Sequence, residues 1–252
     1  MKLIKPYYEI ITPIDGEEIL KQIELAARTC YKSEDKIEYD ICVLTDFQTI
    51  NRKSNNPEEL NKLNVKLVNA KSAKTLILKL ISRGHEAMLE FGGNITVKFI
   101  CDRGVSHELV RHRIASFAQE STRYCNYDKQ HDISYIIPCW LNIEPGIYDY
   151  KKYNEITDVH ARYWAECMYN IEHWYNEFIS VANWSPQQAR SVLPNSLKTE
   201  INISANIREW RHIFKLRTNK AAHPQMRELM CPLLDNFKNQ IPILFDDITY
   251  EK

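Results

Sequence analysis

The chain has 252 residues, with 33 basic (Lys and Arg) and 33 acidic (Asp and Glu) side chains, so its formal net charge is zero. A neutral surface excludes attraction of the whole protein to nucleic acid or to a membrane, and any site for an anion must therefore be local. The shares of hydrophobic (44%) and aromatic (11%) residues exclude global disorder and fit a protein with a large buried core.

The first half of the chain carries clear local patterns. Residues 16–29 have apolar side chains at a helical period, and residues 70–90 predict a second helix that ends near Gly84. Between them, residues 45–62 are polar and indicate a surface insertion. Residues 94–102 are rich in β-branched side chains and predict a strand.

The second half alternates helical and strand patterns. Residues 104–116 return to a helical spacing, and residues 132–138 predict a strand. Residues 158–182 form the clearest helix, with a broad apolar stripe that is typical of a core. Asn206, followed three residues later by Glu209, predicts the capped start of another helix. Long helices with a few separate strands predict an α+β fold.

Nothing in the sequence divides the chain, so residues 1–252 are expected to form a single domain. The first residues lack a secretory signal pattern, and no apolar run approaches the roughly 20 residues that span a bilayer. The seven cysteines are scattered and odd in number, which is typical of reduced thiols. These features predict a cytoplasmic protein.

Phosphate groups, if the protein binds them, are expected to contact side chains. The six glycines form neither a GxGxxG nor a GxxxxGK[ST] pattern, which makes a backbone phosphate cradle improbable. Arginine is the alternative, because its planar guanidinium binds phosphate or carboxylate through two hydrogen bonds. The competing interpretation of an arginine-rich stretch is a solvated helix face paired with nearby glutamates.

Two regions gather arginines. The first is the segment RHRIASFAQESTRY, residues 111–124, where a helical spacing would put Glu108, Arg111 and His112 on one face. In an extended chain, Ser121 and Arg123 would face one side.

The second region runs from residue 190 to residue 223 and contains Arg190, Arg208, Arg211, His212, Arg217 and His223. On an ideal helix Arg208 and His212 share a face, whereas Arg217 points nearly opposite to Arg208. The two arginines would then contact different ligands, or different copies of a site.

Other chemistries find less support. There is no HExxH, no other metal-ligand spacing and no GxSxG, so neither a metal site nor a covalent nucleophile is expected.

The segment RHRIASFAQESTRY closely resembles the signature RHRxxSxNxxSxR of the flavin-dependent thymidylate synthases, the ThyX family. The upstream segment RGHEAMLEF and the downstream segments ARSVLPNS, NIREWRHIFKLR and AHPQMRE resemble further blocks of that family, in the same order. The resemblance covers roughly residues 70–230.

The resemblance implies an α+β fold, in which long helices pack with a small, mostly antiparallel sheet. It implies a homotetramer with active sites at subunit interfaces around FAD. The reaction would be the methylation of dUMP to dTMP, with the carbon from methylenetetrahydrofolate and the reducing equivalents from NADPH. The family needs no protein thiol on the pyrimidine.

Roles for individual residues also follow from the resemblance. The cofactor-binding positions are His85, Arg111, His112, Arg113, Gln119, Asn206, Arg208 and His212. The dUMP-binding positions are Glu108, Arg111, Gln119, Glu120, Ser121, Thr122, Arg123, Arg190 and Arg217. Arg217 would be the catalytic residue, because a fixed cation beside the uracil ring stabilises developing negative charge.

Three positions depart from the family pattern. Ala118 stands where Asn is usual, Ala87 where a hydroxyl residue is frequent, and Gln119 where Glu is frequent. Individual flavin contacts would change at these positions, and the reaction would not.

Two alternatives stay open. One is a flavoprotein of the same scaffold with another pyrimidine nucleotide as substrate. The other is a non-catalytic nucleic-acid-binding protein, which predicts affinity that falls steeply with salt; the zero net charge disfavours it.

Overall fold

The computed structural model describes residues 1–37, 40–45, 48–53, 65–68, 70–125, 127, 133–241 and 243–251. The chain divides into two compact units, each built from three separate stretches of sequence. Unit 1 contains Met1–Ile11, Thr96–Ser204 and Ala221–Leu229, and unit 2 contains Thr12–Ile95, Ala205–Lys220 and Met230–Lys252.

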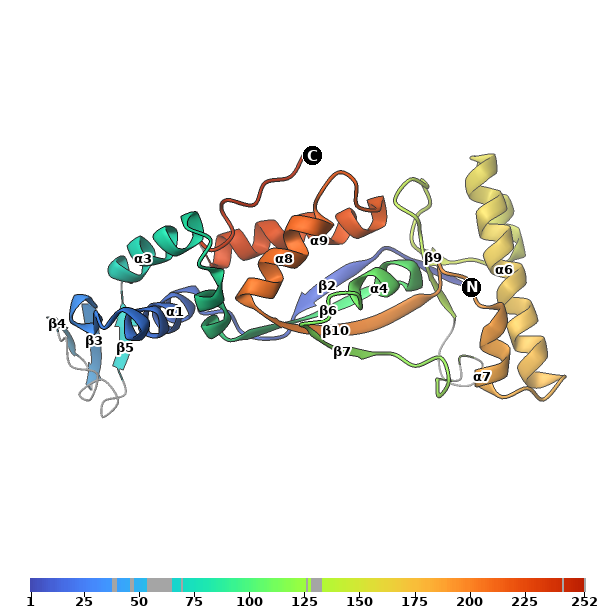
Figure 1. Ribbon diagram of the computed structural model, residues 1–252. Coiled ribbons are helices and arrows are strands. Elements are labelled where there is room, and N and C mark those ends of the chain that lie inside the picture. The colour runs from blue at the N-terminus through green and yellow to red at the C-terminus, as the bar shows by residue number, and fades with distance from the viewer. Residues whose placement is uncertain are drawn as a thin grey trace. The chain divides into compact units, whose positions relative to one another are not determined.

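A four-stranded sheet with the order β2-β6-β10-β7 runs through unit 1 (Figure 1). Its strands are β2 (Tyr7–Ile10), β6 (Asn94–Asp102), β10 (Lys198–Asn206) and β7 (Ser116–Gln119). β2 pairs antiparallel with β6, and β7 pairs antiparallel with β10. The strand predicted over residues 94–102 is therefore confirmed at both ends.

A second sheet and a helical layer complete unit 1. β1 (Lys2–Ile4) lies between β8 (Ser134–Ile136), which is parallel to it, and β9 (Gly146–Ile147), which is antiparallel. The helices are α4 (Arg103–Leu109), α5 (Tyr150–Asn154), α6 (Val159–Ser180) and α7 (Pro186–Ala189), followed by the 3₁₀-helix η3 (Arg190–Val192). Figure 1 shows α7 beside α6.

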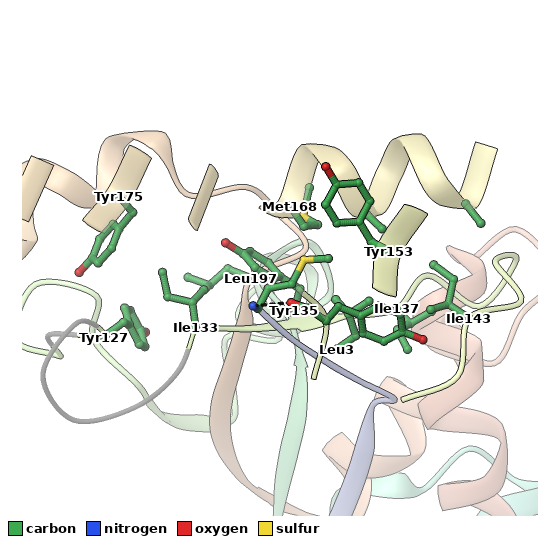
Figure 2. Close-up of a cluster of buried hydrophobic side chains, with 14 of the residues drawn as sticks. Leu3, Tyr127, Ile133, Tyr135, Ile137, Ile143, Tyr153, Met168, Tyr175 and Leu197 are labelled. Carbon is green, nitrogen blue, oxygen red and sulfur yellow. Dashed lines mark hydrogen bonds between the residues drawn. The ribbon is translucent and has the colours of Figure 1, made fainter. Parts of the chain in front are cut away.

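The predicted stripe on residues 158–182 does face the core of unit 1. Met168 and Tyr175 of α6 are buried, and Trp164, Ile171 and Phe178 pack around them. Figure 2 shows this cluster, in which Leu3, Tyr135 and Leu197 from β1, β8 and the chain before β10 contribute further side chains. Asp158 begins the helix, because its carboxylate accepts hydrogen bonds from the N–H groups of residues 160 and 161.

Unit 2 is mainly helical. Its helices are α1 (Gly16–Tyr31), α3 (Lys71–Ser82), α8 (Ile207–Arg217), the larger part of α9 (Pro224–Gln240), and the 3₁₀-helices η1 (Glu34–Lys36) and η2 (Glu86–Gly92). The predicted helices at 16–29 and 70–90 are confirmed as α1 and α3. α3 ends just before Gly84, whose φ of 71° is a left-handed conformation that suits glycine.

Gly92 marks the point where three elements of unit 2 meet. A Cβ atom there would lie 2.7 Å from Ile207 of α8 and about 3 Å from Ile19 and Ile23 of α1. Glycine therefore lets η2 approach both helices closely.

One prediction on the fold is wrong, and another falls partly outside the described residues. The segment 45–62 contributes strand β4 (Gln48–Lys53), which pairs with β3 (Asp40–Thr45) in a three-stranded sheet with β5 (Val65–Val68); residues 46–47 and 54–62 lie outside the described residues. The helix predicted over 104–116 is wrong beyond Leu109, because residues 110–115 form turns and Ser116 begins β7.

Within the described residues, no helix combines the length and the apolar character that crossing a membrane requires.

Candidate active site

The signature segment follows β6 in unit 1 and is a succession of short elements. Asp102 ends β6 and caps α4, because its Oδ1 accepts the N–H of Val105 at 2.8 Å. After Leu109, turns carry the chain through Arg111, whose N–H donates to the Glu108 carbonyl at 3.3 Å. The expectation that Glu108, Arg111 and His112 share a helical face is therefore wrong, since the helix has ended before the two basic residues.

The RHR triplet presents two arginines to solvent around one buried histidine. Arg111 and Arg113 are exposed, and His112 is only 4% exposed. Among the residues that the structure describes, none forms a hydrogen bond or an ion pair with the side chain of Arg111 or Arg113. Both guanidinium groups are thus available for an anion.

Gln119, the last residue of β7, has its amide group turned toward its own unit. The Nε2 atom donates to the hydroxyl of Ser106 at 2.9 Å and to that of Thr199 at 3.2 Å, and both hydroxyl residues are buried. Both amide hydrogens therefore have acceptors within the chain, and the carbonyl oxygen is the atom left for a ligand.

Glu120 is bound by three groups of its own chain. Its Oε1 accepts the Tyr127 hydroxyl at 2.8 Å, and its Oε2 accepts the Lys198 ammonium at 3.1 Å and the N–H of Glu200 at 3.2 Å. Burial would lower the pKa of Lys198, but Glu200 and Glu120 hold that pKa above its usual value. The expectation of a dUMP contact for Glu120 thus meets a carboxylate whose two oxygens already accept hydrogen bonds.

Ser121 to Arg123 form a turn, and the expected extended conformation is wrong. The Ser121 carbonyl accepts the N–H groups of Tyr124 and Cys125 at 3.2 and 3.1 Å, and the Ser121 hydroxyl accepts the N–H of Arg123 at 3.3 Å. The guanidinium of Arg123 is exposed and lies over the ring of Tyr124, 5.4 Å from its centroid.

The structure brings Thr122 and Arg190 together, as a shared site would require. The Thr122 hydroxyl accepts a hydrogen bond of 3.3 Å from Arg190 Nη1. Thr122 is 6% exposed, whereas Arg190 is exposed. The rest of the Arg190 guanidinium can therefore reach a ligand beside the turn.

Glu108 lines a cavity of about 160 Å³ within unit 1. Asp102, His223 and Gln225 also line this cavity, and Gln225 Nε2 donates to Asp102 Oδ2 at 2.8 Å. Burial raises the pKa of the Asp102 carboxyl, although N–H groups of Val105 and Gly104 counteract part of that rise. Asp102 and Gln225 were not singled out from the sequence, because these two hydrogen-bonded residues are 123 positions apart.

α8 in unit 2 carries the second group of expected site residues. The predicted cap is confirmed, because Asn206 Oδ1 accepts the N–H of Glu209 at 2.9 Å. Arg208 and His212 are exposed one turn apart, while Trp210 and Phe214 are fully buried. The helix thus has an apolar face and an accessible cationic face.

Arg208 already has a carboxylate partner. Its Nη1 lies 2.6 Å from Glu90 Oε1, and the two side chains are 50% and 45% exposed. Glu90 belongs to η2 and to the segment RGHEAMLEF, in which only His85 was expected to bind the cofactor. His85 is exposed, and its Nδ1 lies 3.2 Å from the Tyr31 hydroxyl.

Arg211, a member of the second arginine-rich region, has a structural environment. Its side chain is completely buried and donates to both carboxylate oxygens of Asp247 at 2.7 Å, to the Leu244 carbonyl, and to Glu86 at 3.4 Å. Burial would lower the pKa of Arg211, but Asp247 and Glu86 raise it. Arg211 is therefore unavailable for a phosphate, unlike Arg208 one turn earlier.

Arg217 is the last residue of α8 and is partly buried. It lies nine positions after Arg208, which corresponds to half a turn of difference in direction on the observed helix. The predicted opposition of the two arginines therefore follows from the confirmed helix.

A comparison with protein families decides what these residues belong to. Residues 14–243 match the model of a family described as thymidylate synthase complementing protein. The chain belongs to this family. The resemblance of its signature segment to the flavin-dependent thymidylate synthases is thereby confirmed.

Individual relatives carry the same relationship. The chain is 30% identical over 161 residues to a flavin-dependent thymidylate synthase of Pyrococcus furiosus, a match that covers 62% of this chain and 59% of that protein. It is 26% identical over 242 residues to the enzyme of that name from Mycolicibacterium vanbaalenii, covering 94% and 81%. The chain thus spans about three fifths of the length of the P. furiosus relative.

Solved structures share the fold. A UMP/dUMP methylase PolB from Streptomyces cacaoi, bound with 5-Br dUMP, superimposes with a TM-score of 0.67 at 18% identity, covering 98% of this chain and 96% of that one. ThyX from Helicobacter pylori, with FAD and dUMP, gives 0.61 at 20% identity, covering 96% and 98%. The predicted α+β class is confirmed.

Proposed function

We propose that the chain is an FAD-dependent thymidylate synthase. It would methylate dUMP to dTMP, taking the carbon from 5,10-methylenetetrahydrofolate and the reducing equivalents from NADPH. The observation that carries the proposal is the family match over residues 14–243, which includes the complete signature segment. The name shared by the curated relatives supports it further.

The residues present fit an anionic dinucleotide such as FAD. In unit 1, the exposed guanidinium groups of Arg111 and Arg113 find no acceptor among the described residues. In unit 2, Arg208 and His212 present cationic or donor groups on one exposed face of α8. Bound flavin would carry the reducing equivalents. We assign His85, His112, Gln119 and Asn206 to the same cofactor.

The signature turn and Arg190 would hold the nucleotide. Ser121, Thr122, Arg123 and Arg190 supply hydroxyl and guanidinium donors of the kind that phosphates bind. We assign the ribose and base to Glu108, Arg111, Gln119 and Arg217, with Glu120 beside them. The guanidinium of Arg217 would stabilise negative charge that develops on the uracil ring.

Three further expectations belong to this proposal. The protein would act in the cytoplasm as one catalytic domain of 252 residues. It would assemble as a homotetramer in which neighbouring copies complete each site, because Arg208 and Arg217 point to opposite sides of α8. Light scattering that found an active monomer would contradict the assembly.

The deciding experiment is an assay of dTMP formation with and without added FAD. The purified protein is expected to be yellow or to bind FAD on addition, and NADPH should bleach its visible band. A protein that does not bind FAD, or that forms no dTMP with all substrates present, would refute the proposal.

The same assay separates the alternative in which the scaffold acts on another pyrimidine nucleotide. dUMP and UMP are offered side by side at equal concentration. Methylation of UMP in preference to dUMP would keep the flavin chemistry and replace the substrate.

A further inference from the structure

The signature segment contains one acidic side chain, Glu120, whose contacts all lie within its own unit. The backbone N–H of Glu120 donates to the Glu200 carbonyl at 2.9 Å, and its carboxylate accepts the Glu200 N–H at 3.2 Å. Glu120 therefore continues the pairing of β7 with β10 beyond the last residue of the strand. Lys198, two residues from Glu200 on the same strand, adds a 3.1 Å ion pair.

The second partner of Glu120 ties it to the hydrophobic core. Tyr127 donates its hydroxyl to Glu120 at 2.8 Å, while the residue as a whole is 8% exposed. Its ring meets Tyr175 of α6 edge to face, with 6.1 Å between the centroids. Figure 2 shows the two tyrosines together in the cluster of buried side chains.

These contacts enclose the turn that carries the residues proposed to bind the nucleotide. Ser121, Thr122 and Arg123 lie between Glu120, which is fixed on β10, and Tyr127, which is fixed in the core. A ring closed by a hydrogen bond limits the conformations of the chain inside it, and a ligand then loses less free energy in ordering that chain.

We propose that Glu120 is a positioning residue for the nucleotide, which acts by joining β10 to Tyr127 and so holds the turn at 121–123 ready for the phosphate. It does not itself contact dUMP. The inference rests on the proposed function for the identity of the ligand, and it replaces the direct dUMP contact expected for Glu120 from the resemblance.

The test is a double-mutant cycle with Glu120→Gln and Tyr127→Phe. Dissociation constants for dUMP are measured by calorimetry on FAD-loaded protein, together with KM and kcat. Each single variant is expected to bind dUMP about tenfold more weakly, with kcat at saturating dUMP unchanged, because one charge-assisted hydrogen bond is lost. The double variant should bind no more weakly than the worse single variant, since both changes remove the same clamp, the hydrogen bond between Tyr127 and Glu120 that closes the turn.

Tyr148→Phe is the matched control. Tyr148 belongs to the same buried cluster and also donates its hydroxyl at 2.8 Å, to the Glu144 carbonyl. This variant should leave dUMP binding unchanged. An equal loss in Tyr148→Phe would mean that the core had loosened generally, and it would overturn the proposal.

Losses that multiply in the double variant would indicate that Glu120 contacts dUMP directly, and would also overturn it. Hydrogen exchange of the amides of residues 121–125, measured without nucleotide, separates the clamp from the proposed function. If exchange were faster in both variants but the wild-type protein bound no dUMP, the clamp would be supported and the proposed function refuted. Unchanged exchange in both variants would refute the clamp.

Discussion

The two arginine-rich regions of the molecule hold their arginines in different ways. On α8, the helical period sorts them: Arg211 falls on the buried side and meets Asp247, whereas Arg208 falls on the accessible side. In the segment 111–123, all the arginines are exposed and turns and a short strand set the backbone. A regular helix thus assigns roles to its arginines by position, whereas the irregular segment depends on an anchor such as Glu120.

The largest expected effect tests the structural arginine of α8. Arg211→Ala should lower the free energy of unfolding by about 3 kcal/mol, because it removes a buried charge from two carboxylates and a carbonyl. Arg113→Ala, in the exposed segment, should change it by less than about 0.5 kcal/mol. Urea unfolding measures both. Similar losses in the two variants would break the contrast between the regions.

Arg217 tests the division of roles along α8. Arg217→Ala should retain its flavin and still be bleached by NADPH, yet lose about ten- to over a hundredfold in dUMP binding or in dTMP formation, as a charge-assisted hydrogen bond disappears. Arg217→Lys should recover only part of this loss, since a point charge cannot copy the planar fork.

Flavin content, NADPH oxidation and dTMP yield are compared on one preparation. An Arg217→Ala protein that lost its flavin, but converted dUMP normally in excess FAD, would move Arg217 to the cofactor site.

For helices, the buried apolar face could be predicted from the sequence, whereas the partner of a buried arginine on α8 could not. Periodic segments such as 16–29 and 158–182 were predicted correctly, because their apolar faces are buried as the pattern requires. The role of Arg211 was not visible, since its main partner Asp247 lies 36 residues away in the sequence.

The signature segment shows the opposite limit. Its residue types identified the family, but its helical spacing predicted a helix that continues past Leu109. No glycine or proline marks that end. Instead, Ser116–Gln119 pairs with a strand about eighty residues later, and long-range pairing outweighs local propensity. The contacts of Asp102 and Glu120 could not be predicted for the same reason, because their partners Gln225 and Lys198 are distant in the sequence.

Lowering the pH should weaken the contribution of the Asp247–Arg211 ion pair to the free energy of unfolding. Hydrogen bonds from Arg211 lower the pKa of Asp247, so the native state favours its ionised form. The stabilisation is present above the usual pKa of 3.8 and is lost as the pH falls through the lower value in the folded protein.

Asp247→Asn should therefore cost about 1 kcal/mol at pH 7, a modest value because this carboxylate is partly exposed, and progressively less as the pH falls below the usual pKa of 3.8. Urea unfolding at several pH values measures the difference. A difference that stays constant with pH would show that Asp247 acts without its charge.

The smallest expected effect concerns Glu90, the partner of Arg208. Glu90→Gln should raise FAD affinity by up to about fivefold, because an exposed ion pair worth at most about 1 kcal/mol no longer competes for the guanidinium. Asp35→Asn, which removes an exposed charge from η1, controls for general electrostatics. Fluorescence titration with FAD reports both affinities, and weaker binding by Glu90→Gln would make Glu90 a ligand contact.

The division into two units has a consequence for synthesis of the protein. The chain passes from one unit to the other at five points: 11/12, 95/96, 204/205, 220/221 and 229/230. Unit 1 lacks part of its sequence until residue 229 has been translated, and unit 2 until the last residues have been added. At a synthesis rate of about 5–20 residues per second, each unit stays incomplete for many seconds after its first segment has been made. Unit 1 is therefore completed before unit 2, and each unit exposes apolar surface until its last segment has been made.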